Sequence, residues 1–413
     1  MKVLVSAYAC SPYRGSEPGM GWGWIHALSK YYDLWVITEK DEFQSDIETE
    51  LNNKPELRDR IRFYYIPRKR YKILEKIWPP SYYWSYKKWQ KEAYTLAFSL
   101  HKEIGFDIVH QLNMTGYREP GYLWKLPLPF IWGPISGFMQ MPWPFMRILG
   151  LKNAVFYSAR NIINAVQMRF SSRVKKAMLR TNALIAATRE DQAAIKKIFN
   201  KESILINETG VILPSAKSQR LPYNKDRALK LCWCGLIIGR KALPIALHAI
   251  NRLQKALRIE FDIIGDGSER RRCVALSRKL GIDSSVKWHG WIEHDEAIRI
   301  ISHSDIMLLT SIQDSTTSVV MEALYLGVPV ICHDICGFGT VINEICGIKI
   351  PVINPSKSID GFVNAISKLA NNPALLTNLS NGAFRRACEF TWEHKKDAIL
   401  PIYNKMQLNG VHL

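Results

Sequence analysis

Short apolar runs alternate with longer amphipathic segments along the first half of the chain. The runs are rich in β-branched and aromatic residues, which favours buried strands. The segments between them have helical spacing, as in residues 24–31 and 189–199. This alternation predicts a parallel sheet with helices on both faces. We expect its strands at residues 2–9, 34–38, 62–67, 107–112, 129–133, 183–187 and 203–207.

The alternation stops at the polar stretch 214–225 (PSAKSQRLPYNK), which is typical of a linker, and then starts again. The second series predicts strands at 229–235, 260–265, 286–291, 305–310, 329–333 and 347–352, and helices at 244–257, 268–280 and 318–326. A chain of 413 residues also suits two domains.

The predicted fold class is therefore α/β, with two tandem Rossmann-like, doubly wound domains facing a central cleft. We expect the first domain at residues 1–213, the second at 214–390, and a closing helix at 391–413 that crosses back to the first domain. The carboxyl ends of parallel strands are the usual ligand-binding edge of such sheets. The apolar segment 139–146 (MQMPWPFM) is either core filler or a contact for a greasy acceptor.

Membrane spans, signal peptides and metal sites find little support in the sequence. No run of about eighteen apolar residues exists, and MKVLVSAYAC fits the first strand of a cytoplasmic protein better than a signal. None of the eight cysteines forms a C-x-x-C pair. We expect buried, reduced thiols and no metal, with zinc as the less favoured alternative.

Positive charge is concentrated in one part of the chain. The net charge is +19, and residues 51–200, with 26 Lys/Arg and 9 Asp/Glu, account for +17 of it. In residues 58–91 the bases are interleaved with aromatics, namely Tyr64, Tyr65, Tyr71, Trp78, Tyr82, Tyr83, Trp84, Tyr86 and Trp89. This run is either a solvated surface with ordinary buried aromatics or a surface for anionic lipid headgroups. Nucleic acid is a weaker alternative, because no nucleic-acid motif accompanies the run.

A glycine-rich stretch, residues 15–23, follows the first predicted strand. Gly19 and Gly21 would let backbone N–H groups approach a phosphate at a helix start. Glu39, twenty residues after Gly19, also invites a dinucleotide hypothesis, but about ten residues separate the strand from Gly19. A structural turn is an equally good interpretation.

Two further segments follow strands of the second half. Arg240 and Lys241 come after Gly239 and before a helix, where two cations could bind a diphosphate. Gly265 lies in a tight Gly-Asp-Gly turn. Taken alone, these features are equally consistent with surface charges and an ordinary turn.

The most specific constellation begins at Asp314 and ends at Glu322. Its first four residues after Asp314 are Ser315, Thr316, Thr317 and Ser318, a typical helix start whose N–H groups could bind a phosphate. Glu322 shares a helix face with apolar residues, so we expect it to be largely buried. A buried carboxylate needs partners, and the two hydroxyls of a ribose are suitable.

Together these segments resemble the family-four retaining glycosyltransferases of the GT-B fold over nearly the whole chain. The resemblance rests on the glycine-rich stretch, 235–241, the 265–267 turn with 288–291, Asp314-x7-Glu322 and the closing 390–393. The motifs 9–12, 15–22 and 118–134 are similar to a subgroup found with bacterial surface polysaccharide enzymes.

The resemblance implies specific roles. Arg240 and Lys241 would hold the donor diphosphate, Glu322 the ribose, Asp314 the transferred sugar, and the backbone near Trp291 and Ile292 the nucleobase. The chain departs from the family in having Leu236 where an Arg is usual, and Asp rather than Glu at 314.

His110 is the candidate for the acceptor side in the first domain. The segment is Asp-Ile-Val-His-Gln-Leu, and Leu112 stands where the family often has a second His. A structural histidine at a strand end is an equally plausible interpretation.

The implied activity is transfer of a hexose from a nucleotide-sugar with retention of configuration, without a metal ion or other cofactor. The acceptor would be a polysaccharide or a lipid-linked saccharide at the anionic inner face of the cell membrane. A sugar-nucleotide epimerase of the same fold is the nearest alternative. A dehydrogenase and a basic membrane- or nucleic-acid-binding protein are the others.

Overall fold

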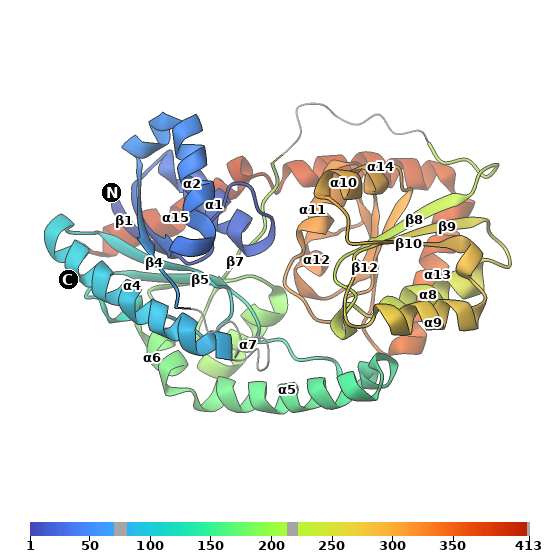
Figure 1. Cartoon of the computed structure of the whole chain (residues 1–413), viewed down its shortest axis with the longest axis horizontal. Coiled ribbons are helices and arrows are strands. Elements are labelled where there is room, and N and C mark those ends of the chain that lie inside the picture. Colours follow the sequence, from blue (N-terminus) through green and yellow to red (C-terminus); the bar gives the residue numbers. More distant parts are fainter. Residues whose placement is uncertain (70–80, 213–221, 411–413) are drawn as a thin grey trace. The chain divides into compact units, whose positions relative to one another are not determined.

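The computed structural model describes residues 1–69, 81–212 and 222–410, with side chains as far as Met406 in the last helix. The chain divides into two compact units (Figure 1). The first comprises Met1–Phe138, Ala165–Gly210 and the segment from Trp392 onward, and the second comprises Met139–Asn164 and Val211–Thr391. Residues 214–221 of the predicted linker, and Tyr71 and Trp78 of the basic–aromatic run, lie outside the described residues.

The first unit contains a seven-stranded parallel sheet in the order β3-β2-β1-β4-β5-β6-β7. All seven expected strands form, with ends within two residues of the predicted ones. Their bounds are β1 Lys2–Ala7, β2 Asp33–Glu39, β3 Ile61–Ile66, β4 Ile108–Asn113, β5 Phe130–Ile135, β6 Ala183–Ala186 and β7 Ile204–Leu205.

The helices of the first unit are α1 Ser16–Ser29, α2 Lys40–Asn53, α4 Tyr82–Ile104, α6 Ser172–Arg180, α7 Arg189–Phe199 and α15 Trp392–Gly410. Helix α5, Leu151–Phe170, belongs partly to each unit. The predicted start of the first helix, at residue 24, is wrong. Helix α1 begins at Ser16, so the glycines at 19, 21 and 23 are helical residues rather than a loop.

The second unit contains a six-stranded parallel sheet in the order β10-β9-β8-β11-β12-β13. Its strands are β8 Leu229–Cys234, β9 Ile259–Ile264, β10 Val286–Gly290, β11 Ile306–Leu309, β12 Val330–His333 and β13 Gly347–Ile350. Its helices are α8 Leu243–Leu253, α9 Arg270–Leu280, α10 His294–Ser302, α11 Ser318–Tyr325, α12 Cys336–Val341, α13 Pro355–Asn371 and α14 Pro373–Cys388. Two doubly wound parallel sheets are thus confirmed.

Alternation along β8 explains why this sheet is buried on both faces. Leu229, Leu231 and Trp233 belong to one apolar core, and Cys232 belongs to a second. Successive side chains point to opposite faces, so two cores form, one on each side of the sheet. This is the arrangement that the near-continuous apolar runs of the sequence predict.

Both sheets reverse their strand order at the same point of the topology. The first strand of each unit lies between the second and the fourth, at β1/β4 and at β8/β11. Segments that leave such neighbouring strands in opposite directions open a crevice at the carboxyl ends, which is where doubly wound folds bind ligands. We therefore expect a ligand site among the residues that follow β8 and β11.

The boundary of the first domain differs from the expected 1–213. Residues 139–164 belong to the second unit because Met141, Phe145, Leu149 and Tyr157 pack in its core. The apolar segment 139–146 is thus partly core filler. No signal in the sequence separates it from the first unit, because the chain returns to that unit at Ala165.

Helix α15 packs on the first unit through aromatic and polar contacts. The indole of Trp392 lies directly against Gly23 and Gly210, and a Cβ at either glycine would overlap it. The buried Lys395 ammonium donates hydrogen bonds to the carbonyls of Asn207 and Thr209. These contacts attach the first turn of α15 to the first unit.

No helix in the described part of the chain combines the length and hydropathy needed to cross a bilayer. None of the eight cysteines, all within described residues, forms a disulfide; six are buried and two are half-buried.

Candidate active site

Charged side chains meet at the β8/β11 reversal point of the second unit. Arg240 Nη1 lies 2.7 Å from one carboxylate oxygen of Asp314, and Lys241 Nζ lies 2.6 Å from the other. Burial alone raises the pKa of Asp314, but the charges of Lys241 and Arg240 outweigh it and hold the pKa below its ordinary value. The sequence predicted these three residues as a set, and the structure brings them together.

Backbone and hydroxyl contacts hold the two loops that carry this cluster. Ile312 donates its N–H to the carbonyl of Arg240 at 2.9 Å, and Thr310 Oγ1 donates to the carbonyl of Lys241 at 2.7 Å. The indole N–H of Trp233 in turn donates to Thr310 Oγ1 at 3.1 Å. The cations are therefore positioned by buried contacts, which is the preorganisation that electrostatic stabilisation requires.

Glycine is required where the ends of neighbouring strands approach each other. Gly265 has φ +124°, and a Cβ there would overlap the carbonyl oxygen of Gly235. Its N–H donates to the carbonyl of Gly290 at the end of β10, 2.8 Å away. Gly265 therefore brings the ends of β8, β9 and β10 to one edge, and Trp291 and Ile292 follow directly. The side chain of Trp291 is exposed and that of Ile292 is half-buried.

Helix α11 begins at this same edge. Ser315 and Thr316 precede its N-cap Thr317, and Ser318 is the first helical residue. Thr317 has extended backbone angles and makes no side-chain capping bond, and its buried hydroxyl has no hydrogen-bond partner among the described residues. A helix start with a spare hydroxyl, three residues after the Asp314 that binds both cations, suits an anionic oxygen.

Glu322, one turn further along α11, is half-buried rather than fully buried. Its carboxylate lies 3.4 Å from Nε2 of His294. The hydrogen bond to Glu322 raises the pKa of His294. Burial, together with the charge of Glu322, raises the pKa of the Cys234 thiol at the end of β8 to about 12. Glu322 therefore faces the ends of the strands, but has more contact with water than the apolar pattern suggested.

Sequence reasoning missed three contacts of this site. Cys336 Sγ accepts the N–H of Asp314 at 3.1 Å, Tyr157 Oη accepts the N–H of Arg240 at 3.3 Å, and His294 contacts Glu322. Tyr157 comes from α5, eighty-three residues before Arg240, and nothing in the sequence connects the two. His294 could have been found, since it opens the helix directly after Trp291 and Ile292.

His110 is placed in the core of the first unit, on β4. Its ring is fully buried, and burial lowers its pKa to about 4. A carbonyl can only accept, so Nε2 donates to the carbonyl of Gly133 at 2.6 Å and Nδ1 accepts from the hydroxyl of Tyr403 at 2.6 Å. Both ring nitrogens are engaged. This fits the structural alternative, so His110 is not carried into the proposed chemistry.

Gly19 and Gly21 also have structural explanations. Both lie in helix α1, and a Cβ at these positions would overlap the carbonyl oxygens of Arg14 and Ala9 respectively. Carbonyl oxygens repel a phosphate, so the phosphate hypothesis has no support here. The dinucleotide hypothesis finds no support either, because Glu39 is buried and caps α2 by accepting the N–H groups of Asp41 and Glu42.

The basic–aromatic run 58–91 is divided between core and surface. Trp89 and Tyr86 are fully buried, and the indole of Trp89 donates to the carbonyl of Ile66 at 3.0 Å. Arg68 is also buried and donates to Ser85 Oγ at 2.7 Å. The lipid-surface interpretation is therefore wrong for Trp89, because its side chain is buried in the core. Trp84 is exposed.

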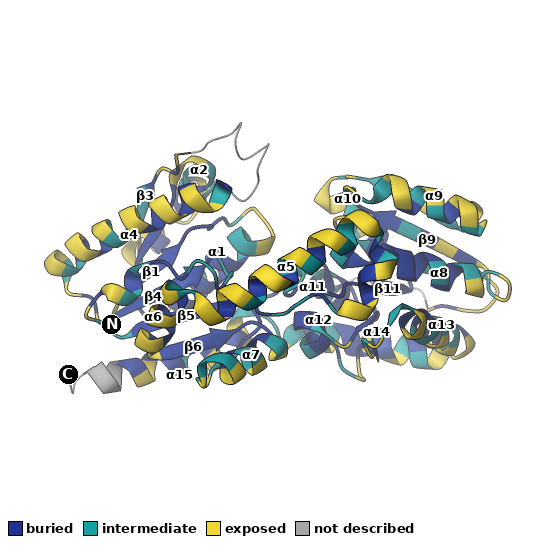
Figure 2. Ribbon diagram, turned by 90° about the horizontal axis from the view of Figure 1, so that it is seen from below, coloured by how far each residue is buried: buried dark blue, intermediate teal, exposed yellow. Residues whose placement is uncertain are grey.

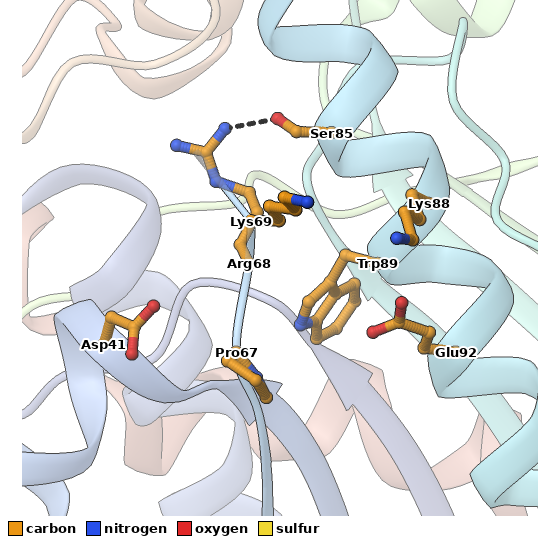
Figure 3. A pocket seen from close by; sticks show the side chains of 8 residues that line it. All are labelled: Asp41, Pro67, Arg68, Lys69, Ser85, Lys88, Trp89 and Glu92. Carbon is orange, nitrogen blue, oxygen red and sulfur yellow. Dashed lines mark hydrogen bonds between the residues drawn. The ribbon is translucent and has the colours of Figure 1, made fainter. Parts of the chain in front are cut away.

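Part of this run lines a cavity of about 270 Å³ in the first unit (Figure 3). Arg68 and Lys69 approach it from the end of β3, and Lys88 and Trp89 approach it from α4. Asp41 and Glu92 contribute the opposite charge. The lining is of mixed sign, so it gives no clear preference for an anionic ligand.

Over residues 1–69, 81–212 and 222–410, no three His, Cys, Asp or Glu side chains converge in a way that could hold a metal ion.

The second unit resembles a known protein family in sequence. Residues 218–386 match a glycosyltransferase family. The matching model describes glycosyl transferases group 1, and the matched segment contains Arg240, Lys241, Asp314 and Glu322. This segment of the second unit is therefore similar to group 1 glycosyl transferases.

Curated relatives extend the same picture at low identity. The D-inositol 3-phosphate glycosyltransferase of Rhodococcus erythropolis is 24% identical over 255 residues, which are 57% of this chain and 56% of the relative. The lipopolysaccharide 1,6-galactosyltransferase of Salmonella typhimurium is 32% identical over 112 residues, which are 27% of this chain and 31% of the relative. The match thus spans little more than half of the first relative's length.

Solved structures show the GT-B fold over almost the whole chain. The lipopolysaccharide outer core galactosyltransferase WaaB, in its apo form, superposes with a TM-score of 0.65 at 15% identity, covering 97% of this chain and 99% of that one. HepE of Anabaena, in complex with UDP, superposes with a TM-score of 0.60 at 13% identity, covering 98% and 100%. At these identities the likeness establishes the fold alone, and the predicted fold class is confirmed.

Proposed function

We propose that the chain is a retaining hexosyltransferase that moves a sugar from a nucleotide-sugar donor to a saccharide or lipid-linked acceptor, without a metal ion. The observation that carries this proposal is the placement of Arg240, Lys241 and Asp314 at the β8/β11 reversal point, within the segment that matches group 1 glycosyltransferases. The complex of HepE with UDP supports a nucleotide-sugar as the donor.

The leaving diphosphate would bind the cations and the start of α11. Asp314 uses one lone pair of each oxygen for Lys241 and Arg240, while the guanidinium has five N–H donors in total and the ammonium has three. Both cations therefore keep donors for a second anion. Their charge, fixed in place by Asp314, would stabilise the negative charge that grows on the diphosphate as the glycosidic bond breaks.

Glu322 would accept the ribose hydroxyls. It lies at the same edge of the sheet, one helical turn from Ser318, and part of its carboxylate remains accessible beside His294. Oδ1 of Asp314 also accepts the N–H of Ser315 at 3.1 Å, so one lone pair of Oδ2 remains and could accept a hydroxyl of the transferred sugar. With no carboxylate assigned as a nucleophile, attack of the acceptor hydroxyl on the same face as the leaving group is the mechanism we propose for retention.

Lipopolysaccharide galactosyltransferases among the relatives and the structures support a surface-polysaccharide or lipid-linked acceptor. Such an acceptor would place the protein at the inner, anionic face of the cell membrane. His110 contributes no proton-transfer group to this proposal.

A panel of nucleotide-sugars in a thermal-shift assay tests donor binding directly. A bound donor stabilises the folded chain by about 2.7 kcal/mol at a hundred times its Kd. Glu322→Gln should lose about 1–3 kcal/mol of donor affinity and remain folded, since it removes hydrogen bonds to a charged group. The exposed Glu344 provides the control, and Glu344→Gln should bind as the wild type does.

Two outcomes would contradict parts of the proposal. If calorimetry gives Glu322→Gln the same donor affinity as the wild type, the ribose assignment fails. Transfer that stops in EDTA and returns with magnesium would exclude the metal-free mechanism. An NMR assay of the product's anomeric configuration decides between retention and inversion.

A further inference from the structure

Helix α5 turns polar side chains toward the protein and apolar side chains toward solvent. The side chains on its inner side include Tyr157, Asn161, Asn164 and Met168, all buried, so two asparagines face the protein. Asn161 is held by two hydrogen bonds to the backbone of Met141, of 2.9 and 2.8 Å. A helix on the surface of a globular protein normally turns its apolar face inward and its polar face to water.

The outer side of α5 is apolar. Seven residues on it are between 51% and 84% exposed, namely Leu151, Val155, Phe156, Ile162, Ile163, Val166 and Phe170. At about 100° per residue these positions fall within one arc of about 140°, so they form a continuous apolar stripe. Figure 2 shows this side of α5 as a largely exposed surface. Scattered exposed apolar residues need no explanation, but a contiguous stripe indicates a contact surface.

The charge around the stripe indicates what it contacts. No acidic residue occurs between Glu119 and Glu190, whereas ten Lys and Arg residues do. Exposed bases lie on α5 itself, at Lys152 and Arg169, and continue on α6 at Lys175, Lys176 and Arg180. The ammonium of Lys175 lies 6.0 Å from the ring centroid of Phe170, so a base borders the apolar stripe directly.

We infer that the outer side of α5 is a docking surface for an anionic lipid bilayer. A helix with one apolar side that contains Phe and Ile, and with exposed Lys and Arg near its two ends, is suited to lie in the plane of the interface. The apolar side chains enter the acyl boundary, and the bases remain among the headgroups. A protein partner would need acidic groups to match these bases, whereas an anionic bilayer supplies them everywhere.

The lipid contact does not depend on the transferase assignment, because the apolar stripe and the residues that contact the donor loop lie on different sides of α5. The inner side of α5 contacts the donor loop: Tyr157 accepts the N–H of Arg240, and Asn153 borders Gly239. Substitutions confined to the outer side should therefore leave donor affinity unchanged.

Vesicle co-sedimentation of the full chain, without donor, tests the inference. The probes are vesicles of phosphatidylglycerol mixed with phosphatidylcholine, and vesicles of phosphatidylcholine alone. Phe156→Gln/Ile163→Gln/Phe170→Gln should lower binding to the anionic vesicles at least about tenfold, because buried apolar area is lost. Lys175→Gln/Lys176→Gln should lower it about fivefold per lysine at low salt and much less at high salt.

Helix α4 offers a matched control, since it too has exposed aromatics beside bases. Tyr83→Gln/Trp84→Gln/Phe98→Gln changes three of them and should leave vesicle binding unchanged. All variants should unfold at the wild-type temperature, because only exposed side chains change. An equal loss of binding in the α4 variant and the α5 variant would overturn the assignment of the surface to α5.

Other occupants of the stripe would show themselves in the same set of variants. A concentration-dependent dimer that the α5 variant abolishes would identify a second copy of the chain and overturn the lipid assignment. Tighter binding to single-stranded RNA than to anionic vesicles, lost in the same variant, would overturn it as well. Normal vesicle binding by a chain that binds no nucleotide-sugar would leave this inference standing and reject the proposed function.

Discussion

The carboxyl ends of the two sheets have the same topology and glycine-rich flanking segments, but they use their polar groups differently. In the first unit the groups are engaged within the protein. Glu17 accepts the N–H and the hydroxyl of Thr115, Glu39 caps a helix, and both nitrogens of His110 are bonded. In the second unit Arg240, Lys241 and Asp314 form a cluster of net positive charge beside a helix start that keeps a spare hydroxyl.

This contrast teaches that glycine content and strand order do not by themselves make a phosphate site. Gly21 packs against a backbone carbonyl, which repels anions. Gly265 allows three strand ends to approach, so that the residues after them gather at one edge. What distinguishes the two edges is whether donors remain available for a ligand.

The largest effect should follow from breaking the charge cluster of the second unit. Asp314→Asn leaves the buried Lys241 without its counter-ion, and such a loss typically costs about 3–5 kcal/mol. Urea unfolding at pH 7 measures it, with Glu344→Gln as the exposed control. Removing the cations instead would strand the carboxylate, so loss of turnover in such variants must be compared with loss of stability.

The pH dependence of this difference provides a second check. The folded-state pKa of Asp314 is lowered, so its stabilising contribution is present above the unfolded pKa of about 3.9 and is lost as pH falls through the folded pKa. The gap between wild type and Asp314→Asn should be full at neutral pH and should close in acid. A gap that stays constant between pH 7 and pH 3 would show that the aspartate is not ionised in the cluster.

The strands and the charge cluster could be predicted from the sequence because both depend on local patterns. All thirteen strands in the described part of the chain were foreseen, since strands buried on both faces give continuous apolar runs. The cluster was foreseen because Arg240 and Asp314 each follow such a strand directly, and neighbouring parallel strands end at the same edge.

What the sequence could not provide depends on contacts between distant segments. The start of α1 was misplaced because glycine is a poor helix former, whereas here it is required by Trp392, which lies far away in the sequence. The outward apolar side of α5 was missed because the sequence does not show which side of a helix faces the core. The sequence left open whether the aromatic residues of α4 are buried or at the surface, and the structure divides them: Trp89 fills the core and Trp84 is exposed.

A smaller effect should come from the first unit, where Gly23 packs against the indole of Trp392. Gly23→Ala should cost about 1–3 kcal/mol of unfolding free energy, because the added methyl must displace a large side chain. Gly116 is the control, since nothing lies within 4 Å of a Cβ added there, and Gly116→Ala should be close to neutral. Adding Trp392→Ala should recover part of the loss; if it does not, the overlap with the indole is not its cause.

The smallest effect concerns His294. Because it contacts Glu322, its titration reports whether that carboxylate is available to a ligand, unlike Glu17 of the first unit. Its raised pKa means that the ion pair with Glu322 stabilises the fold below the unfolded histidine pKa of about 6.5 and ceases to do so as pH rises through the folded pKa. Because the His294 side chain is largely exposed, the contribution should stay below about 1 kcal/mol.

NMR titration of the imidazole gives a sharper reading than stability does. Glu322→Gln should bring the pKa of His294 back toward its ordinary value, because the carboxylate charge is removed. A saturating nucleotide-sugar should lower the pKa as well, since ribose hydroxyls that donate to Glu322 weaken its hold on the imidazolium. The carboxyl pKa of Glu17 in the first unit should not change when the donor is added, because Glu17 already accepts hydrogen bonds from Thr115. If the donor binds tightly while the titration of His294 stays unchanged, Glu322 is as engaged as Glu17 and the contrast between the two edges fails at this residue.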